Sequence, residues 1–243
     1  MNRLEGRTAV VTGAAGGIGS AVCRRLASEG ARVVATDIAV EAVMELAREV
    51  GGLGRMLDVT DPAAAAALAA ELGEVDVLVN NAGWDRVMHF LETTPEHWEK
   101  VLRLNLFSQI SVSHAFARGM AERRRGRIVN IASDAGKVGS SGETVYAAAK
   151  GGVIAFTKSL ARELARDNVN VNCVCPGPTE TAFLDVFEGE RGQNILEGMR
   201  RAVPLRRFAT PDDVAGAVAY LASDDAAYLT GQAISVDGGL VMS

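Results

Sequence analysis

The sequence predicts an α/β fold in which one parallel sheet of seven strands has helices on both faces. Short apolar runs alternate with segments of helical spacing along the chain, which is typical of repeated strand–helix units. Several of the apolar runs have no polar face, and this favours strands that are buried on both sides of a parallel sheet. The strand-like runs span residues 8–13, 31–37, 54–59, 75–81, 126–133, 169–177 and 232–239.

The segments between these runs carry apolar residues three or four positions apart, as on the buried side of a helix. Residues 18–26 and 153–164 show this spacing. At 61–62, 94–95 and 210–211 an Asp or a Thr precedes a proline. Each of these pairs predicts a capped helix start, because proline suits the first helical turn.

Composition and charge narrow the functional classes. The 243 residues are 48% hydrophobic and 23% charged, so we expect one sizeable core and a single domain over residues 1–243. A net charge of −5 argues against a nucleic-acid partner, because clustered lysine and arginine hold phosphate backbones. No run reaches the ~18 apolar residues of a membrane span and the start lacks a signal peptide, so we expect a cytoplasmic protein without membrane contact.

The three cysteines and three histidines do not form a metal-binding pattern. Cys23, Cys173 and Cys175 lack the paired spacing of zinc ligands, so we expect reduced, buried thiols. The histidines lack the spacing that would place two of them on one face of a helix. We therefore expect no metal site.

The stretch "TGAAGGIG" follows the first predicted strand and opens a helix. Glycines at positions 13, 17 and 19 allow a tight turn, a close approach to a pyrophosphate and close helix packing. Asp37 ends the second strand about twenty residues further on, where a carboxylate accepts hydrogen bonds from ribose hydroxyls. A 2′-phosphate would meet the like charge of Asp37, and none of Ala14, Ala15, Gly16 or Ile38 offers a compensating cation. The sequence therefore favours NAD over NADP.

The stretch "SSGETVYAAAKGG" places a tyrosine and a lysine four positions apart among small residues. Because residues four apart share a helix face, we expect Tyr146 and Lys150 to project into one site. The ammonium of Lys150, with a positive nicotinamide ring nearby, would stabilise the tyrosinate and lower its pKa. Tyr146 could then act as a general base.

Together with "NNAG" at 80–83, Asn105, Ser133 and "PG" at 176–177, the order and spacing of these motifs resemble the short-chain dehydrogenase/reductase family. The resemblance covers essentially the whole chain. It implies a Rossmann-type doubly wound sheet and hydride transfer between an alcohol carbon and a nicotinamide cofactor.

The resemblance also implies a role for each catalytic residue. Tyr146 would transfer the proton at the substrate oxygen, and Ser133 would hydrogen-bond and orient that oxygen. Lys150 would additionally bind the nicotinamide ribose. Asn105 would support a water-linked proton relay to Lys150.

Several loops would build the cofactor and substrate sites that the resemblance implies. The cofactor-binding residues would be Gly13, Ala15, Gly17, Ile18, Gly19, Asp37, Ile38, Asp58, Val59, Asn81, Ala82, Gly83, Tyr146, Lys150, Pro176, Gly177, Thr179 and Thr181. The substrate-binding residues would be Trp84, Asp85, Asp134, Ser140, Ser141, Phe183 and Leu184.

Within the family, four stretches resemble the dehydrogenases that act on 2-hydroxycyclohexanecarboxyl-CoA. These stretches are "NNAGWD", "RGRIVNIASDAGKVGSSGETVYAAAKGG", "VCPGPTET" and "TGQAISVDGGLVM". They imply a cyclic or branched hydroxyacyl-CoA as the small-molecule substrate, and Arg191, Arg200, Arg201 or Lys137 could bind the CoA phosphates. The segment 183–207, with weak periodicity and mixed charge, would cover the substrate as a lid.

Other functions remain open. A 3-oxoacyl carrier-protein reductase has the same motifs, although Asp37 counts against it because such enzymes often use NADPH. A simple cyclic-alcohol or sugar dehydrogenase also fits, because motifs specify the reaction better than the substrate. A non-catalytic protein that senses NAD is a further alternative, and the presence of Ser133, Tyr146 and Lys150 argues against it. The resemblance further implies a homotetramer in which helices at about 95–119 and 144–166 pair between chains.

Overall fold

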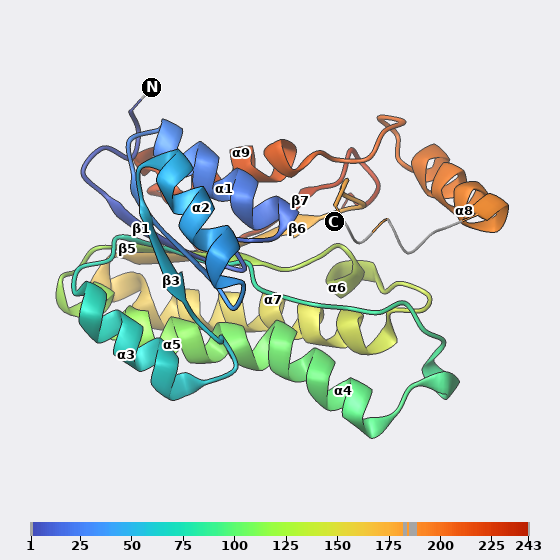
Figure 1. The fold of residues 1–243 in the computed structure, drawn as a ribbon, viewed down its shortest axis with the longest axis horizontal. Helices are drawn as coiled ribbons and strands as arrows, with labels where there is room; N and C mark the ends of the chain where they lie inside the picture. The colour runs from blue at the N-terminus through green and yellow to red at the C-terminus, as the bar shows by residue number, and fades with distance from the viewer. Residues whose placement is uncertain (1, 182–183, 185–188, 243) are drawn as a thin grey trace.

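The computed structural model describes residues 2–181, 184 and 189–242, with the backbone alone at 190 and 191. Seven strands form one all-parallel sheet in the order β3-β2-β1-β4-β5-β6-β7 (Figure 1). The strands are β1 Thr8–Thr12, β2 Arg32–Asp37, β3 Leu53–Met56, β4 Val77–Asn80, β5 Gly126–Ile131, β6 Val169–Pro176 and β7 Ala233–Val236. Each predicted strand is present, and the predicted α/β fold is confirmed.

The strand order reverses at the centre of the sheet. Val10 of β1 pairs with Val34 of β2 on one side and with Leu78 of β4 on the other. Where the order reverses, the connections that leave neighbouring strands pass to opposite faces, and a crevice opens between them. The loops after β1 and β4 therefore border the expected ligand site.

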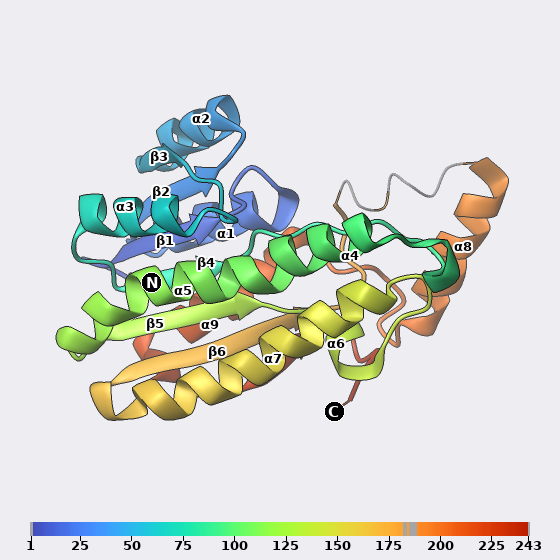
Figure 2. The ribbon, with the colours of Figure 1, turned by 90° about the horizontal axis from the view of Figure 1, so that it is seen from below.

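Helices cover the sheet in two layers. Figures 1 and 2 show α1, α2 and α9 on one face and α3, α4, α5 and α7 on the other. The helices are α1 Gly17–Ser28, α2 Val40–Val50, α3 Pro62–Leu72, α4 Pro95–Leu102, α5 Ser108–Glu122, α6 Ala135–Val138, α7 Thr144–Leu164, α8 Gly189–Ala202 and α9 Pro211–Ala222. Successive residues of β1 alternate between the layers, so that Val11 lies in the core of the first and Val10 in that of the second. None of the described helices is long and apolar enough to cross a membrane.

The three predicted capped helix starts are confirmed. Asp61 accepts a hydrogen bond from the Ala63 backbone at 2.8 Å at the start of α3, and the Thr94 hydroxyl accepts one from the backbone at the start of α4. At the start of α9, Thr210 and Asp213 each bond the other's backbone N–H, which satisfies two donors reciprocally. These local signals fix where each helix begins.

A row of buried polar side chains links β4 and β5 to α7. The Asn80 amide donates to the Asn130 side-chain oxygen at 2.8 Å, and the Asn130 amide donates to the Thr157 hydroxyl at 2.9 Å. All three residues are at most 1% exposed. Because a buried amide is costly without partners, this row favours one arrangement of β4, β5 and α7.

We predict that Asn130→Ala lowers the free energy of unfolding by about 1–3 kcal/mol, because Thr157 and Asn80 each lose a buried partner. Denaturant unfolding of the variant and the wild type measures the change. Asn2→Ala is the control, because Asn2 is exposed. Equal stability of Asn130→Ala and the control would contradict the importance of the row.

Candidate active site

The loop after β1 and the first turn of α1 are too tightly packed for side chains at Gly13 and Gly19. Gly13 has a φ of +64°, and a Cβ there would lie 2.7 Å from the Ala82 Cα. A Cβ on Gly19 would lie 2.1 Å from the Gly13 carbonyl oxygen. No described side chain caps the amino end of α1, so its first N–H groups remain available to an anion such as a pyrophosphate.

Hydrogen bonds join this loop to the loop after β4. The Thr12 hydroxyl accepts from the backbone N–H groups of Asn81 at 3.0 Å and Ala82 at 3.1 Å. The Asn81 amide donates to the carbonyls of Thr12 and Gly13, both at 3.0 Å. The "NNAG" segment thus fixes the glycine loop at the crevice.

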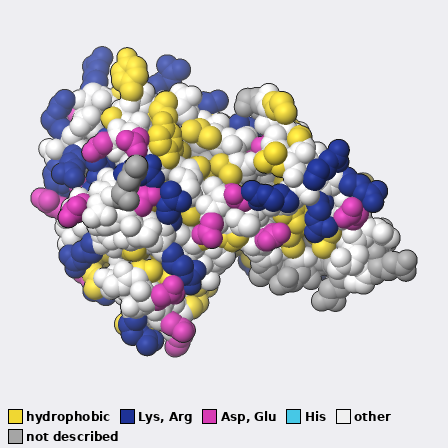
Figure 3. Space-filling view, turned by 90° about the horizontal axis from the view of Figure 1, so that it is seen from above, with side chains coloured by type: hydrophobic (Ala, Val, Ile, Leu, Met, Phe, Trp, Pro, Cys, Tyr) yellow, Lys and Arg dark blue, Asp and Glu magenta, His cyan; other side chains and the backbone are white. Residues whose placement is uncertain are grey.

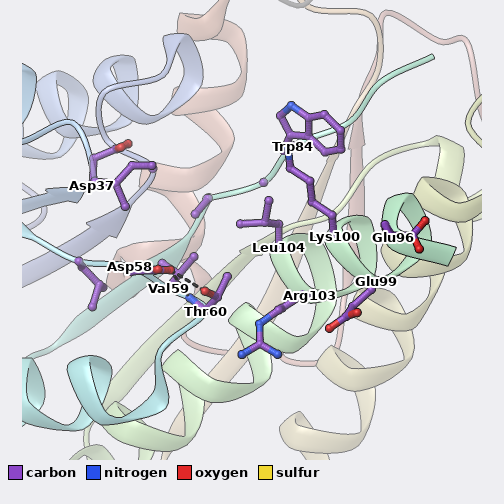
Figure 4. Close-up of a pocket in the computed structure, with 15 residues that line it drawn as sticks. Asp37, Asp58, Val59, Thr60, Trp84, Glu96, Glu99, Lys100, Arg103 and Leu104 are labelled. Atoms are coloured by element: carbon purple, nitrogen blue, oxygen red, sulfur yellow. Dashed lines mark hydrogen bonds between the residues drawn. The ribbon is translucent and has the colours of Figure 1, made fainter. Parts of the chain in front are cut away.

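A cavity of about 670 Å³ lies beside these loops (Figure 4). Asp37 stands at the end of β2, where its carboxylate accepts from the Ala15 N–H at 3.2 Å and the Ala39 N–H at 3.1 Å. The lining residues are Gly13, Asp37, Ile38, Leu57, Asp58, Val59, Thr60, Ala82, Gly83, Trp84, Glu96, Glu99, Lys100, Arg103 and Leu104. A loop that has no side chain at Gly13, beside a cavity of this size with a carboxylate at its rim, fits the adenosine half of a dinucleotide.

Asp58 is held at the wall of this cavity. Its carboxylate accepts hydrogen bonds from the hydroxyl of Thr60 at 2.7 Å and from the Thr60 N–H at 2.8 Å. These bonds lower the pKa of Asp58. Asp58 is therefore an anion that is fixed in place on the same wall as Val59.

The loop after β6 comes close to the start of α1. The Thr179 hydroxyl donates to the Gly177 carbonyl at 2.9 Å, and Thr181 follows it. A Cβ on Gly17 would lie 3.1 Å from the Thr181 methyl group. Residues 176–181, which the sequence assigns to the cofactor, therefore adjoin the glycine loop.

Tyr146 and Lys150 meet Ser133 as the sequence predicts. Both project from α7, and the Lys150 ammonium lies 5.5 Å from the Tyr146 ring centroid. The ammonium donates to the Ile131 carbonyl at the end of β5 at 2.8 Å. Ser133 follows β5, and its hydroxyl is a hydrogen-bond partner of the Tyr146 phenol. A phenol, a hydroxyl and an ammonium thus converge at the carboxyl end of the sheet.

Asn105 lies in a π-helical turn, Arg103–Phe107, between α4 and α5. Its amide donates to the carbonyls of Trp84 at 2.6 Å and Val101 at 2.9 Å, while its oxygen accepts from the Trp84 N–H. A Cβ on Gly83 would lie 2.7 Å from the Asn105 oxygen and 3.5 Å from the Lys150 nitrogen. Asn105 therefore holds the chain at Gly83, next to Lys150.

Burial dominates the titration of the catalytic pair. Lys150 is 2% exposed, and burial lowers its pKa to about 8. Burial also raises the pKa of Tyr146 above its usual value; Glu143 and Asp85 raise it further, while the Ser133 hydrogen bond lowers it. The protein's own groups therefore raise the phenol pKa, because burial and two nearby carboxylates outweigh the Ser133 hydrogen bond. The predicted lowering by Lys150 together with a nicotinamide ring stays a prediction.

Those two carboxylates lie next to each other. Burial raises the pKa of Asp85 to about 6, and the side chain of Glu143 raises it as well. One oxygen of Asp85 is buried and has no hydrogen-bond partner among the described residues. Glu143 accepts a hydrogen bond from Ser140. No three described His, Cys, Asp or Glu side chains are grouped so as to hold a metal ion.

Comparisons with known proteins agree with this geometry. Residues 13–241 match the family model described as enoyl-(acyl carrier protein) reductase. The chain is 42% identical to the 3-oxoacyl-[acyl-carrier-protein] reductase FabG of Escherichia coli, over 98% of this chain and 99% of that protein. It is also 42% identical to nodulation protein G of Rhizobium meliloti, over the full length of both.

Two solved structures are similar over nearly the whole chain. One, titled a ribose-5-phosphate isomerase from Brucella melitensis, has a TM-score of 0.92 and 39% identity over 99% of this chain and 94% of that one. The other is a short chain dehydrogenase/reductase family protein, with a TM-score of 0.88 and 36% identity over 98% of both chains. The chain belongs to the short-chain dehydrogenase/reductase family. It is an oxidoreductase that acts on alcohol or keto groups.

The predicted substrate residues of this short-chain dehydrogenase/reductase do not all line the cavity. Trp84 lines the cavity, with the Lys100 ammonium 3.7 Å from its ring centroid (Figure 4). Ser140 and Ser141 precede α7, and Leu184 is half-buried in the loop after β6. Phe183 lies outside the described residues.

Asp134 differs from the other predicted substrate residues. It is 4% exposed, and its carboxylate accepts from the Ser235 hydroxyl at 2.7 Å. These contacts face β7 and the C-terminal segment, so they favour a supporting position behind Ser133. Sequence reasoning missed Glu143, although its place three residues before Tyr146 puts both within one helical turn.

We predict that Glu143→Gln lowers the pKa of Tyr146 by about one unit, because it removes a negative charge beside the phenol. The chain has three tyrosines, so the tyrosinate absorbance of each protein is titrated against its own Tyr146→Phe derivative. Glu163→Gln, an exposed change on the same helix, is the control. A shift of equal size in the control, or an upward shift in Glu143→Gln, would contradict the role of Glu143.

Proposed function

We propose that this enzyme uses NAD(H) to interconvert a secondary alcohol and a ketone on an acyl thioester, with a 3-oxoacyl group on an acyl carrier protein as the first substrate to test. The convergence of Ser133, Tyr146 and Lys150 beside a dinucleotide-sized cavity carries the reaction class. The names of the relatives support the thioester. This substrate is the alternative that the sequence left open, and it replaces the cyclic acyl-CoA as the leading choice.

The chain's own groups supply the proton chemistry. The bound nicotinamide would accept or donate the hydride. Tyr146 would move the proton at the substrate oxygen, and Ser133 would hold that oxygen through its hydroxyl. Lys150, buried and bonded to Ile131, would place a positive charge under the phenol when protonated. Asn105 would keep the chain at Gly83 clear of the site.

Asp37 supports NAD over NADP. Its carboxylate lies at the end of β2, where a 2′-phosphate would meet a like charge. The two cations that line the cavity, Lys100 and Arg103, lie on the opposite wall (Figure 4). Lys100 is placed over Trp84, and Arg103 lowers the pKa of Asp58 as a minor cause. Neither cation is a partner of Asp37.

We predict that Asp37→Asn reduces the preference for NAD over NADP by about tenfold, because it removes the charge that repels a 2′-phosphate. The dissociation constants of both cofactors are measured by calorimetry for the variant and the wild type. Asp58→Asn is a matched control, because it changes a carboxylate on the same cavity and should leave the ratio unaltered. An unchanged ratio in Asp37→Asn would remove the basis for the choice of NAD.

The carboxyls of Asp85 and Glu143 favour a thioester over a free acid. Both lie near enough to Tyr146 to raise the pKa of its phenol. A free hydroxy or oxo acid would bring its own carboxylate close to these groups, and the repulsion of like charges in a partly buried site disfavours it. A thioester has no charge at that position.

A cyclic hydroxyacyl-CoA such as 2-hydroxycyclohexanecarboxyl-CoA is the second candidate. The sequence stretches around Ser133 and Tyr146 favour it. Arginines that could contact CoA phosphates are exposed near α8, where Lys and Arg side chains gather in Figure 3. Arg200 and Arg201 both pair with Glu197 at 3.0 Å, so binding a phosphate there would require them to exchange partners. The side chain of Arg191 lies outside the described residues.

The segment around α8 is proposed to act as a lid. In Figure 1 α8 lies at the edge of the molecule, beyond the carboxyl ends of the strands. A bridge between Thr179 and Ala209 joins the two ends of the segment at its base. The lid would therefore begin and end next to the loop after β6.

A homotetramer is proposed as the assembly. Four large apolar side chains on neighbouring helical segments are each 36–42% exposed. They are Trp98 and Leu102 of α4, Phe107 of the π-helical turn and Ile110 of α5. Large apolar side chains gathered along neighbouring helices favour contact with another chain. They lie within the predicted pairing segment, 95–119.

We predict turnover of a 3-oxoacyl carrier-protein thioester with NADH, because the thioester masks the acid charge and NADH suits Asp37. The assay follows NADH and NADPH absorbance with this substrate, 2-hydroxycyclohexanecarboxyl-CoA, an enoyl thioester, free hydroxy acids, cyclic alcohols and sugars. Tyr146→Phe is the control and should lose at least about a hundredfold in rate, because it lacks the transferable proton.

The outcomes of this assay distinguish the candidate substrates. Turnover of the carrier-protein thioester that is lost in Tyr146→Phe supports the proposal. Turnover confined to the cyclic acyl-CoA moves the assignment to the second candidate, and turnover confined to free alcohols, sugars or acids contradicts the thioester. No turnover of any substrate, with NAD binding intact, would favour a protein that senses NAD.

A further inference from the structure

Asp134 is a buried carboxyl directly behind the catalytic serine. It follows Ser133 and precedes α6, and it is 4% exposed. One of its oxygens accepts from the Ser235 hydroxyl at 2.7 Å, and that hydroxyl accepts from the Lys137 ammonium at 3.0 Å. The other oxygen, Oδ2, is buried without a hydrogen-bond partner among the described residues. A buried carboxylate oxygen without a donor is costly and calls for an explanation.

Asp237, just after β7, supplies the facing group. It is 8% exposed and accepts hydrogen bonds from the backbone N–H groups of Gly239 at 2.9 Å and Val241 at 2.5 Å. These bonds fold the C-terminal segment back toward the ends of β6 and β7, where Figure 1 places the C-terminus. The Asp237 carboxyl raises the pKa of Asp134 as a hydrogen-bond partner. It can accept a bond from Asp134 only if Asp134 carries a proton.

Gly177, in the loop assigned to the cofactor, packs onto both carboxyl residues. A Cβ on Gly177 would lie 2.7 Å from the Asp237 Cβ and 3.5 Å from the Asp134 Oδ2. Backbone hydrogen bonds also join these segments, and we call this contact the joint. The Asp134 N–H donates to the Pro176 carbonyl and the Gly177 N–H donates to the Val236 carbonyl, both at 3.1 Å. The ends of β5, β6 and β7 thus meet at these two carboxyls.

The groups around Asp134 determine its charge. The pKa of Asp134 is raised to about 7, with burial as the largest cause and Asp237 as a further one. Ser235 and the Lys137 ammonium act in the opposite direction. Among the described residues, a further titratable neighbour is the buried thiol of Cys175 on β6. Two buried carboxyls so close together are costly to ionise fully, because like charges repel in a medium of low polarity.

We propose that Asp134 and Asp237 share one proton, and that this acid pair fixes the loop at Gly177 and the C-terminal segment 237–241 beneath Ser133. The proton gives Oδ2 of Asp134 its missing partner. Asp134 is then a positioning residue, because it acts on the reaction through Ser133 and the cofactor loop. Loss of the proton places two like charges against Gly177 and loosens the joint. The inference holds whichever thioester is the substrate.

Thermal unfolding as a function of pH tests the shared proton. Native Asp134 keeps its proton up to about pH 7, whereas the unfolded chain releases it near 3.8. The wild type therefore loses stability as the pH rises between these values, and the loss stays constant above them. Asp134→Asn has no proton to release, so its melting temperature should rise by several degrees relative to the wild type over this range.

Asp225→Asn is the control for the loss of one carboxylate, because Asp225 is exposed and pairs only with Arg3 among the described residues. Its melting temperature relative to the wild type should not rise with pH. A difference between Asp134→Asn and the wild type that is independent of pH would overturn the shared proton. An equal rise in Asp225→Asn would do the same.

Turnover tests the positioning role. Asparagine can still bond to both Ser235 and Asp237, whereas leucine of similar size cannot. We expect kcat of Asp134→Asn to exceed that of Asp134→Leu by about tenfold, because the joint under Ser133 is kept. The ratio of Asp134→Asn to wild-type kcat should rise from about pH 5 to about pH 8. Equal kcat in the two variants, or a ratio without pH dependence, would overturn the positioning role.

A measurement on the wild type covers the case in which Asp134→Asn does not fold. With ¹³C-labelled aspartate, one side-chain carboxyl resonance should titrate near pH 7 and move in Asp237→Asn. The absence of an aspartate resonance that titrates near pH 7 and moves in Asp237→Asn would overturn the proposal, and a resonance that titrates near pH 6 and moves only in Glu143→Gln belongs to Asp85.

Discussion

The arrangement of the whole site depends on the reversal of strand order between β1 and β4. There the chain must bring two loops to the same edge of the sheet and hold them together without filling the crevice. The hydrogen bonds between Thr12 and Asn81 and the absence of side chains at Gly13 and Gly19 meet both requirements. The cavity and the candidate catalytic residues lie on either side of these two loops, which follow β1 and β4.

Burial affects both the position and the charge of the candidate catalytic residues Tyr146 and Lys150. Lys150 is tied to Ile131, and its burial lowers its pKa to about 8, while burial raises the pKa of Tyr146. The protein alone therefore favours the neutral phenol. A positively charged cofactor ring beside the phenol would act in the opposite direction, so the charge needed for proton transfer would come with the cofactor.

Two pairs of carboxyl groups flank the candidate active site. Asp85 and Glu143 lie at the Tyr146 side, where they oppose ionisation of the phenol. Asp134 and Asp237 lie behind Ser133, where they join the ends of three strands. The two pairs of carboxyls differ in solvent exposure, because Asp85 and Glu143 are half-buried whereas Asp134 and Asp237 are buried.

The sequence by itself determined the fold, the strands, three helix starts and the shared helix face of Tyr146 and Lys150. These features follow from local signals: apolar periodicity, proline after a capping residue and a four-residue interval on one helix. Tertiary structure alone decided which polar residues meet. Asp134 follows Ser133 in the chain, yet its partners are about a hundred residues away, at 235 and 237. Charge and burial at such a contact depend on every element packed around it, so spacing along the chain does not encode them.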